Sequence, residues 1–487
     1  MVTEKMKPGA AWLGIVKHPS TGIRLPEIFL PGILAAWRER GIAGTLSLSF
    51  GRETAPEDVI NAPPGTWEFT RGHTGTSIRH YMTVGAREAE RAGVTVEIEA
   101  DHLIIIGSQA AALRRLTGDH TESHISPEEL ERSLEYYHMC LDEAAAVGNM
   151  GCLTIDPSDL FWAQADRLSG ARVRELFATR FPGAEGRDLL ARYGRTVRFP
   201  APGARTVQVT VSELQAMRLA LKFADSLRVS KELCDYTREA LGHDRFSVEI
   251  ALDETADPTG PRDTLFWLTE AKAMGLPIHY AGPHLGFAKR VDYTGDLALL
   301  ERRTRQQHAI SQGISGALLS IHSGDGSGPY SGKGPGVYEA LVRATGGELK
   351  FKISDVYFEL LMDMMAARPA GSEGRRLFER IFDAVEGYLR DQVKQGGPLL
   401  TPLLVEQLAE YDRDVAGDPS KRRDSRAQVF RFHQFLALNM RDEAGGRPWR
   451  EAIIAFVAGN DDFRVEFDRE AKELMLRLVD GLGFGNI

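Results

Sequence analysis

Three short polar groups in the sequence contain side chains that bind metal ions and transfer protons in enzymes. Asp101 is followed by His102, Asp253 is followed by Glu254, and His322 opens a glycine-rich stretch; each group comes directly after a β-rich run. Imidazole nitrogens and carboxylate oxygens together suit zinc, manganese or iron. Neighbouring carboxylates can also divide into an acid and a base, because like charges held close raise one of the two pKa values. The three groups therefore predict a divalent metal centre with acid–base groups beside it.

Charged residues also occur inside two of the β-rich runs. Lys350 and Lys352 lie on one face of the run Leu349 to Ile353. A lysine at that depth is costly to bury unless it meets a carboxylate or an anionic substrate. Lys352 is therefore predicted to contact substrate or act in catalysis, and Lys350 to form a deeper ion pair. Glu249 shares the alternation of Asp253 but lies deeper, so a substrate contact and a buried structural carboxylate both stay open.

The chain contains eight short β-rich runs, four of which precede or contain these groups, and stretches with helical periodicity separate them. Strands that alternate with helices form parallel sheets, so this order favours a doubly wound sheet or a closed (β/α)8 barrel. No Gly-x-Gly-x-x-Gly follows the first run, and the count of eight favours the TIM barrel, in which all strand ends converge on one cavity. The expected strands are Trp12 to Val16, Thr45 to Phe50, Val94 to Ala100, Cys152 to Ile155, Phe246 to Leu252, Ile278 to Ala281, Ala317 to Ile321 and Leu349 to Ile353.

Two regions exceed a minimal barrel of about 250 residues. The connection between the fourth and fifth strands, about 156–244, contains an amphipathic stretch that begins at Ser212, and it predicts a helical insertion covering the barrel mouth. Helical patterns recur after the eighth strand. The expected organisation is a barrel over residues 1–365, which includes the insertion, and a C-terminal helical extension over 366–487 packed on the barrel.

The composition is that of a folded protein without nucleic-acid-binding or membrane character. Hydrophobic residues make up 43% of the 487 residues, and a net charge of -9 leaves no basic stripe for phosphates. No apolar run approaches the roughly 20 residues of a membrane span. The three cysteines include no Cys-x-x-Cys pair, and the N-terminus lacks a secretory apolar segment. A cytoplasmic protein with a small-molecule substrate is expected; the number of subunits, including a homo-oligomer, stays open.

The glycine-rich stretch from Gly324 to Gly334 does not form a P-loop. Ser327 stands five positions before Gly332, where a P-loop requires glycine, and Gly334 replaces the Ser or Thr that would hold magnesium. The sequence also lacks the Gly-x-Ser-x-Gly elbow of serine hydrolases. A flexible lid beside His322 is the favoured interpretation.

The order of the strand-end motifs resembles that of the tagaturonate epimerase family. The similarity is clearest over about residues 245–360, and Glu99 to Leu103 extends it upstream. The motifs are Glu249 to Thr255 with Pro258-Thr259, Gly282-Pro283 with Val291 to Asp296, Ser320 to Gly324, and Lys350 to Lys352.

The resemblance implies a metal-dependent isomerase that acts on a keto-hexuronate, tagaturonate or fructuronate. The carbon whose configuration is inverted is not adjacent to the ketone; one carbon lies between them. The ketone therefore does not acidify the proton on that carbon, and simple enolisation cannot exchange it. Retro-aldol cleavage, rotation of the aldehyde fragment and aldol closure form the economical route. A divalent metal, zinc, manganese or iron, would polarise the ketone.

The expected roles fall on residues at or near the strand ends. The expected metal ligands are His102, Asp253 and His322, with Glu254 as an alternative to Asp253. The expected catalytic residues are Asp101 and Glu254 as acid–base groups and Lys352 to orient a substrate oxygen. The expected substrate contacts are Ser323, His284, Asp325 and Glu249.

Two positions depart from the family pattern. The strand-seven loop reads Asp325-Gly326-Ser327 where the family continues Ser-Asp-Lys, and His284 stands where an arginine follows Pro283. Either cation could pair with a substrate carboxylate, and arginine does so through a bidentate fork that histidine cannot reproduce. A neutral ketose, or a phosphosugar bound by Arg290 or Lys333, is therefore the alternative substrate.

The same motifs are similar, more distantly, to the non-catalytic subunit of tagatose-bisphosphate aldolase. This similarity provides an alternative function, a barrel that stabilises a partner enzyme and does no chemistry itself. Stoichiometric metal and turnover of a ketose or keto-uronate by the purified chain would exclude it.

Overall fold

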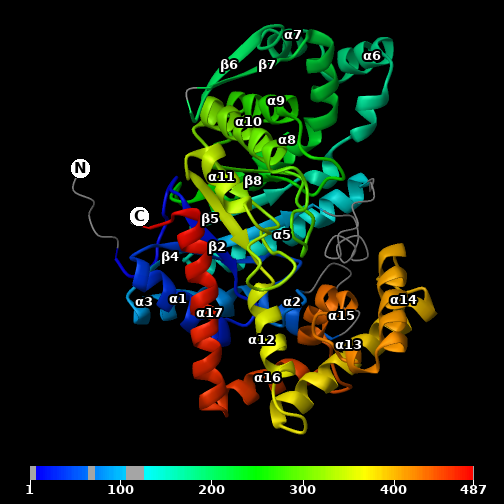
Figure 1. Cartoon of the computed structure of the whole chain (residues 1–487). Coiled ribbons are helices and arrows are strands. Elements are labelled where there is room, and N and C mark those ends of the chain that lie inside the picture. Colours follow the sequence, from blue (N-terminus) through cyan, green and yellow to red (C-terminus); the bar gives the residue numbers. More distant parts are fainter. Residues whose placement is uncertain (1–6, 64–71, 106–124, 204, 486–487) are drawn as a thin grey trace.

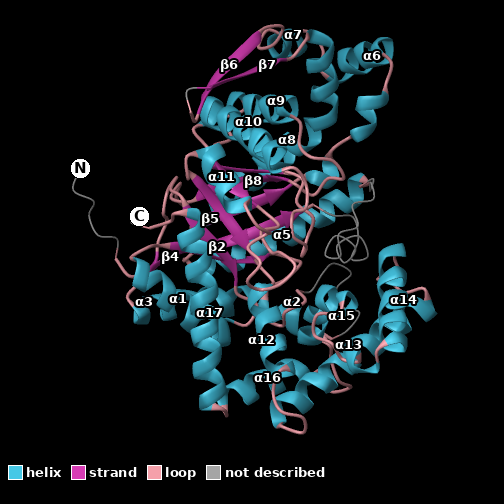
Figure 2. Ribbon diagram, viewed as in Figure 1, coloured by secondary structure: helices cyan, strands magenta, loops and turns pink. Residues whose placement is uncertain are grey.

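The computed structural model describes residues 7–63, 72–105, 125–203 and 205–485. Eight parallel strands close into a barrel at its centre, because the last strand pairs with the first (Figures 1 and 2). The predicted α/β TIM barrel is thus confirmed. In order around the ring the strands are β2 (His18–Gly22), β3 (Gly44–Ser49), β4 (Thr95–Ile104), β5 (Cys152–Asp156), β8 (Ser247–Leu252), β9 (Tyr280–Pro283), β10 (Leu318–Ile321) and β11 (Leu349–Ile353).

The first barrel strand is β2, and the prediction of a strand over Trp12 to Val16 was wrong. The short strand β1 (Gly9–Ala10) instead pairs with the beginning of β4. Strand β2 has the sequence His-Pro-Ser-Thr-Gly, which shows no apolar alternation, yet all five residues are buried. The Nε2 atom of His18 lies 2.8 Å from the Thr45 hydroxyl, so polar contacts inside the barrel replace apolar burial. The other seven predicted strands overlap observed ones.

One helix of the outer layer follows each strand. These helices are α1 (Pro26–Arg40), α3 (Ile78–Ala92), α5 (Pro127–Val147), α8 (Glu213–Leu241), α9 (Pro261–Ala273), α10 (Leu297–Ser315), α11 (Val337–Thr345) and α12 (Val356–Ala366). Ser212 caps α8 as expected, since its hydroxyl accepts a hydrogen bond from the Gln215 N–H. Helix α12 has Asp355 at its N-cap without a side-chain cap bond.

The insertion precedes α8 and combines helices with strands. It contains α6 (Gly170–Arg180), α7 (Ala184–Leu190) and an antiparallel hairpin of β6 (Thr196–Ala201) and β7 (Arg205–Thr210). The hairpin packs on α9 and α10, where Arg262 Nε donates to the Thr210 carbonyl at 3.0 Å (Figure 1). The expectation that this region covers the barrel mouth is therefore wrong for the hairpin.

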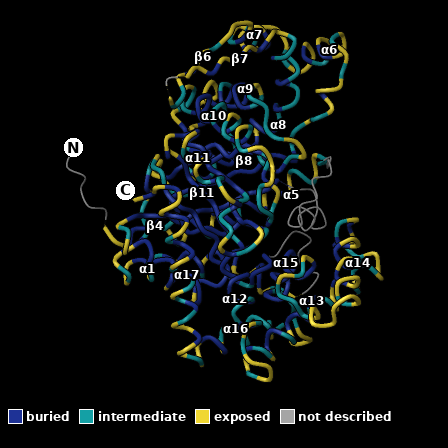
Figure 3. The backbone as a smooth tube through the Cα atoms, in the orientation of Figure 1, coloured by how far each residue is buried: buried dark blue, intermediate teal, exposed yellow. Residues whose placement is uncertain are grey.

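Five helices follow α12: α13 (Glu373–Gln395), α14 (Pro402–Gly417), α15 (Gln428–His433), α16 (Pro448–Ala458) and α17 (Asp461–Leu482). Helix α17 packs along α1 and α11 on the outside of the barrel (Figure 1). The segment of α15 reaches the mouth, because Arg431 pairs with Glu359 and donates to the Gly326 carbonyl at 3.1 Å. Buried residues concentrate in the barrel and its surrounding helices (Figure 3). Within the described ranges, no helix is both long and apolar enough for a membrane span.

Candidate active site

The predicted metal-binding residues meet at the carboxyl ends of the strands. His102 lies in the last part of β4, Asp253 follows β8, and His322 follows β10. Potential ligand atoms of all three lie within 4.8 Å of one another, and the two imidazole centroids are 4.8 Å apart. The glycine at position 282 makes room for this arrangement, since a Cβ there would lie 2.8 Å from the His322 Nε2 atom.

Both imidazoles are oriented by carboxylates. His322 Nδ1 lies 3.0 Å from Asp253 Oδ1, and its Nε2 lies 2.7 Å from Glu249 Oε1. His102 Nδ1 lies 3.2 Å from Asp156 Oδ2. Burial disfavours the charged imidazole, but Asp253 and Glu249 outweigh it and raise the pKa of His322 to about 10. Burial likewise acts to raise the pKa of Asp253, but His322 outweighs it and lowers this pKa to about 2.

His102, Asp253 and His322 fit a divalent transition metal. Two imidazoles and one carboxylate form a donor set that zinc, manganese and iron accept, with positions left for substrate. Each ring also has a fully buried carboxylate beside one nitrogen, Asp156 beside Nδ1 of His102 and Glu249 beside Nε2 of His322. Such outer carboxylates fix the orientation of metal-bound histidines. A metal would replace the proton that His322 otherwise shares with Asp253.

Two further groups of possible donors differ in their suitability. Potential ligand atoms of His102, Asp156 and Glu254 also lie within 4.8 Å of one another, and this group includes an imidazole. Those of Glu99, Cys152 and Glu249 lie equally close, but the Lys350 ammonium lies among them, 3.0 Å from Glu99 Oε2 and 2.8 Å from Glu249 Oε2. A cation already balances that group, so it does not fit a metal.

Lys352 forms the floor of the site. Its Nζ atom lies 2.7 Å from Asp101 Oδ1, 2.8 Å from Glu99 Oε1 and 2.7 Å from Glu249 Oε1. Burial opposes its charge, but these carboxylates outweigh burial and raise the pKa of Lys352 above its ordinary value. Burial acts to raise the pKa of Asp101, and Lys352 reverses this effect and lowers it. Near neutral pH the pair is therefore an ammonium and a carboxylate.

The four predicted substrate contacts occupy different places. Ser323 and Asp325 line the cavity in front of the histidines. Asp325 also accepts hydrogen bonds from the backbone N–H groups of Ser354 and Asp355, and it thereby fixes the loop after β11. Glu249 is fully buried behind His322, which favours the structural alternative for this residue.

His284 is not among the residues that line the cavity. Its backbone N–H donates to the Thr259 hydroxyl at 2.8 Å, and this bond ties the loops after β8 and β9 together. We therefore assign no substrate contact to His284.

Three cavity residues other than glycine have a left-handed backbone. The φ angles are 40° at His102, 54° at Ser323 and 55° at Arg290. Such conformations cost on the order of 1–3 kcal/mol each and concentrate at functional sites. Their position around one cavity supports its assignment as the site of chemistry.

The cavity has a volume of about 100 Å³ and is lined by more cations than the sequence predicted. Arg24, Arg52 and Lys289 belong to its lining, together with Glu53. The pair Arg52-Glu53 comes shortly after the second predicted strand. A charged pair at the end of a strand was the one feature of the sequence that could have indicated these cavity residues. Without the fold, nothing distinguished it from an ordinary surface loop.

The two cations that were the predicted phosphate contacts of a phosphosugar, Arg290 and Lys333, form their contacts with the protein itself. Arg290 pairs with Asp355 and donates to the Phe432 carbonyl. Lys333 is buried and donates to the carbonyls of Ala288 at 2.5 Å and Asp325 at 3.0 Å. These contacts do not favour phosphate binding by either residue.

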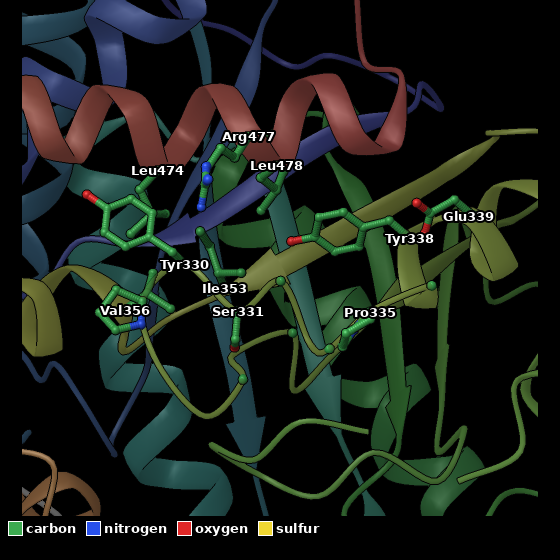
Figure 4. Close-up of a pocket in the computed structure, with 16 residues that line it drawn as sticks. Tyr330, Ser331, Pro335, Tyr338, Glu339, Ile353, Val356, Leu474, Arg477 and Leu478 are labelled. Atoms are coloured by element: carbon green, nitrogen blue, oxygen red, sulfur yellow. The ribbon is translucent and has the colours of Figure 1, made fainter. Parts of the chain in front are cut away.

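A second cavity, about 250 Å³, is lined by the glycine-rich loop and by residues of α11 and α17 (Figure 4). Tyr330 donates to Glu470 Oε2 at 2.5 Å, and Arg477 lies 5.2 Å from the centre of the Tyr330 ring. These contacts attach the predicted lid to α17. None of the histidines or acids of the first cavity lines this one, so its larger size does not mark the site of chemistry.

Comparison with known proteins gives consistent results. The model of the tagaturonate epimerase family, UxaE, matches residues 139–391, just over half of the chain. A tagaturonate/fructuronate epimerase from Thermotoga maritima is 32% identical over 130 residues, which cover 26% of this chain and 25% of that protein. The match thus spans about a quarter of that relative. Native and glycerol-complexed crystal structures of the fructuronate-tagaturonate epimerase UxaE from Cohnella laeviribosi have a TM-score of 0.65 at 17% identity. They align with 98% of this chain over 83% of their own, which shows the shared fold.

Proposed function

Since this chain belongs to the tagaturonate epimerase family, a family of isomerases, we propose that it interconverts tagaturonate and fructuronate with a divalent metal held by His102, Asp253 and His322. The main support for this proposal is that potential ligand atoms of these three side chains lie within 4.8 Å of one another at the mouth of the barrel. A sugar substrate follows from the family. The metal, its ligands and the choice of uronate belong to the proposal.

The proposed reaction breaks and re-forms one carbon–carbon bond. A base removes the proton from the hydroxyl of the carbon to be inverted, the adjacent bond cleaves to an enolate and an aldehyde, and the aldehyde turns before the bond forms again. When bound, the metal supplies a Lewis acid that polarises the ketone. No atom is gained or lost, so the reaction needs no other cosubstrate.

The chain supplies the proton transfer and the charge stabilisation. Asp101 is the proposed base, because its lowered pKa keeps it ionised and able to accept a proton. Glu254, across the same cavity, is the second proposed acid–base group. Lys352 keeps its proton and is proposed to orient the substrate oxygen on which negative charge develops. Ser323 is proposed to contact a substrate hydroxyl.

A substrate panel tests this function on protein of measured metal content. The panel contains tagaturonate, fructuronate, tagatose, fructose and the ketose phosphates. The proposal predicts conversion between the two uronates by metal-containing protein. Turnover of a neutral or phosphorylated sugar alone would replace the proposed substrate, and stoichiometric metal without turnover of any compound would favour the partner-subunit alternative.

A further inference from the structure

We propose that Arg52 and Lys289 bind the carboxylate of the uronate, and that Glu254 competes with the substrate for these two cations. The inference rests on the proposed function and adds its specificity determinants. In this proposal, Arg52 and Lys289 take the place of the two cations of the family pattern that are missing at His284 and in the strand-seven loop.

The three side chains meet at one edge of the cavity. Lys289 Nζ lies 2.8 Å and 3.0 Å from the two carboxylate oxygens of Glu254. Arg52 Nη1 lies 3.4 Å from Glu254 Oε1. All three line the same cavity as His102 and His322. A carboxylate held by an arginine and a lysine beside the candidate metal centre is the arrangement that a uronate requires.

The guanidinium of Arg52 has donor capacity left for a ligand. Its side chain is 11% exposed, and its other bond is from Nη2 to the Ser49 hydroxyl at 3.2 Å. The Nε–H group is buried and has no hydrogen-bond partner among the described residues. A buried donor without a partner is costly, whereas an arginine fork that binds a carboxylate satisfies two donors at once. Binding of the uronate would therefore satisfy a group that the protein leaves unpaired.

Each of the remaining cations of the cavity is held by several acceptors of the protein. Arg24 pairs with Glu53 at 2.6 Å and also with Asp355. Lys352 contacts three carboxylates, and Arg290 contacts Asp355 and backbone carbonyls. A substrate that captured one of these cations would leave a buried carboxylate without its partner, which is strongly unfavourable.

Glu254 has a second set of partners within reach. Its carboxylate also belongs to the group with His102 and Asp156, in which the ligand atoms lie within 4.8 Å of one another. A small movement of the Glu254 carboxylate toward His102 would release Arg52 and Lys289 and would place it within hydrogen-bond reach of the imidazole. Such a movement would also enlarge the cavity of about 100 Å³, which is below the roughly 300 Å³ at which typical ligand pockets begin.

Matched substrates test the assignment. The variants are Arg52→Met, Lys289→Met and the conservative Arg52→Lys, with Arg87→Met as control, because Arg87 is 60% exposed and lies on the outer helix α3. Each is assayed with tagaturonate and with tagatose, in which a hydroxymethyl group replaces the carboxylate. Metal content and the thermal midpoint are measured on the same samples.

We expect Arg52→Met to raise KM for tagaturonate at least tenfold and to lower the ratio of kcat/KM for tagaturonate over tagatose by a similar factor. Lys289→Met should act in the same direction, and Arg52→Lys should fall between wild type and Arg52→Met. An unchanged ratio, or equal losses on both substrates, overturns the inference.

Calorimetric titration with galactonate, which has the carboxylate but no ketone, supplies a readout independent of turnover. Arg52→Met should weaken its binding at least tenfold, and Glu254→Gln should strengthen it by removing the competitor. Weaker binding to Glu254→Gln contradicts the competition. If the wild type converts tagaturonate and Arg52→Met keeps its KM, only this inference fails; if the wild type converts neither uronate, the proposed function itself fails.

Discussion

At the scale of single residues, the barrel interior is a network of ion pairs where apolar packing would be expected. Lys352 and Lys350 lie between Glu99, Glu249 and Asp101, and all five are buried. Buried ion pairs of this kind contribute little net stability, but loss of one partner leaves an uncompensated charge. The network therefore positions groups for chemistry more than it stabilises the fold.

Replacement of Lys352 by methionine tests this balance. The side chain volume is kept while one ammonium is removed from three carboxylates, so we expect a loss of about 3–5 kcal/mol in the free energy of unfolding. We also expect kcat to fall at least about 100-fold, because the group that stabilises negative charge is lost. Urea unfolding and turnover of tagaturonate measure the two effects. The control Lys472→Met removes a lysine whose side chain is 35% exposed and pairs with Glu39, so it should leave turnover unchanged and cost at most about 1 kcal/mol of stability.

Glu97 gives a prediction for the pH dependence of stability. Burial raises its pKa from 4.5 to about 8, although Lys350 acts in the opposite direction. Between these values the unfolded chain has released the proton and the folded chain retains it, so this residue lowers the free energy of unfolding as pH rises through that window. The slope is at most about 1.4 kcal/mol per pH unit.

Glu97→Gln removes this contribution and keeps an oxygen for the Leu13 N–H, which donates to Glu97 Oε1 at 3.0 Å. Relative to wild type, the variant should gain stability between pH 5.5 and pH 8 in urea unfolding. A constant difference between the two proteins across this range would contradict the raised pKa.

At the scale of elements, apolar runs in the sequence identified seven of the barrel strands. Strand β2 was missed because its buried residues are polar and form hydrogen bonds with side chains of other strands. Ser354, just after β11, likewise has polar partners from other parts of the chain, because its hydroxyl lies 3.4 Å from Arg24 Nη2 and from Glu53 Oε1. The proximity of His102, Asp253 and His322 could be predicted because each lies near or directly after the carboxyl end of a strand. The positions of Arg52 and Lys289 in the cavity could not be predicted, since they depend on loops that only the fold brings together.

The contact between α1 and α17 depends on one small residue. A Cβ at Gly32 would lie 2.7 Å from the Cβ of Ala471 and 2.7 Å from the Asp468 carbonyl oxygen. Gly32→Ala should therefore destabilise the protein by about 1–3 kcal/mol through overpacking, despite a gain of up to about 1 kcal/mol in helix propensity. Gly387→Ala in α13 is the matched control, because nothing lies within 4 Å of its added Cβ, and it should stabilise. Equal thermal midpoints for the two variants would show that the helices separate easily.

At the scale of the whole molecule, the family match and the fold match have different extents. The family model matches residues 139–391, whereas the structural likeness to the Cohnella laeviribosi enzyme covers 98% of the chain. The first barrel strands and the C-terminal helices have thus kept their fold beyond the region of the family match. Arg431 of α15 pairs with Glu359 of α12, so the C-terminal helices contact the region of the family match at the mouth of the barrel.

The most direct test of the central claim is elemental analysis of the purified chain, coupled to an assay of tagaturonate conversion. We expect about one zinc, manganese or iron ion per wild-type chain together with conversion to fructuronate. His322→Ala should lose both while its far-UV circular dichroism is retained, and His80→Ala, at a residue whose side chain is 42% exposed, should lose neither. A His322→Ala protein that keeps its metal and its activity would contradict the assignment of the metal centre.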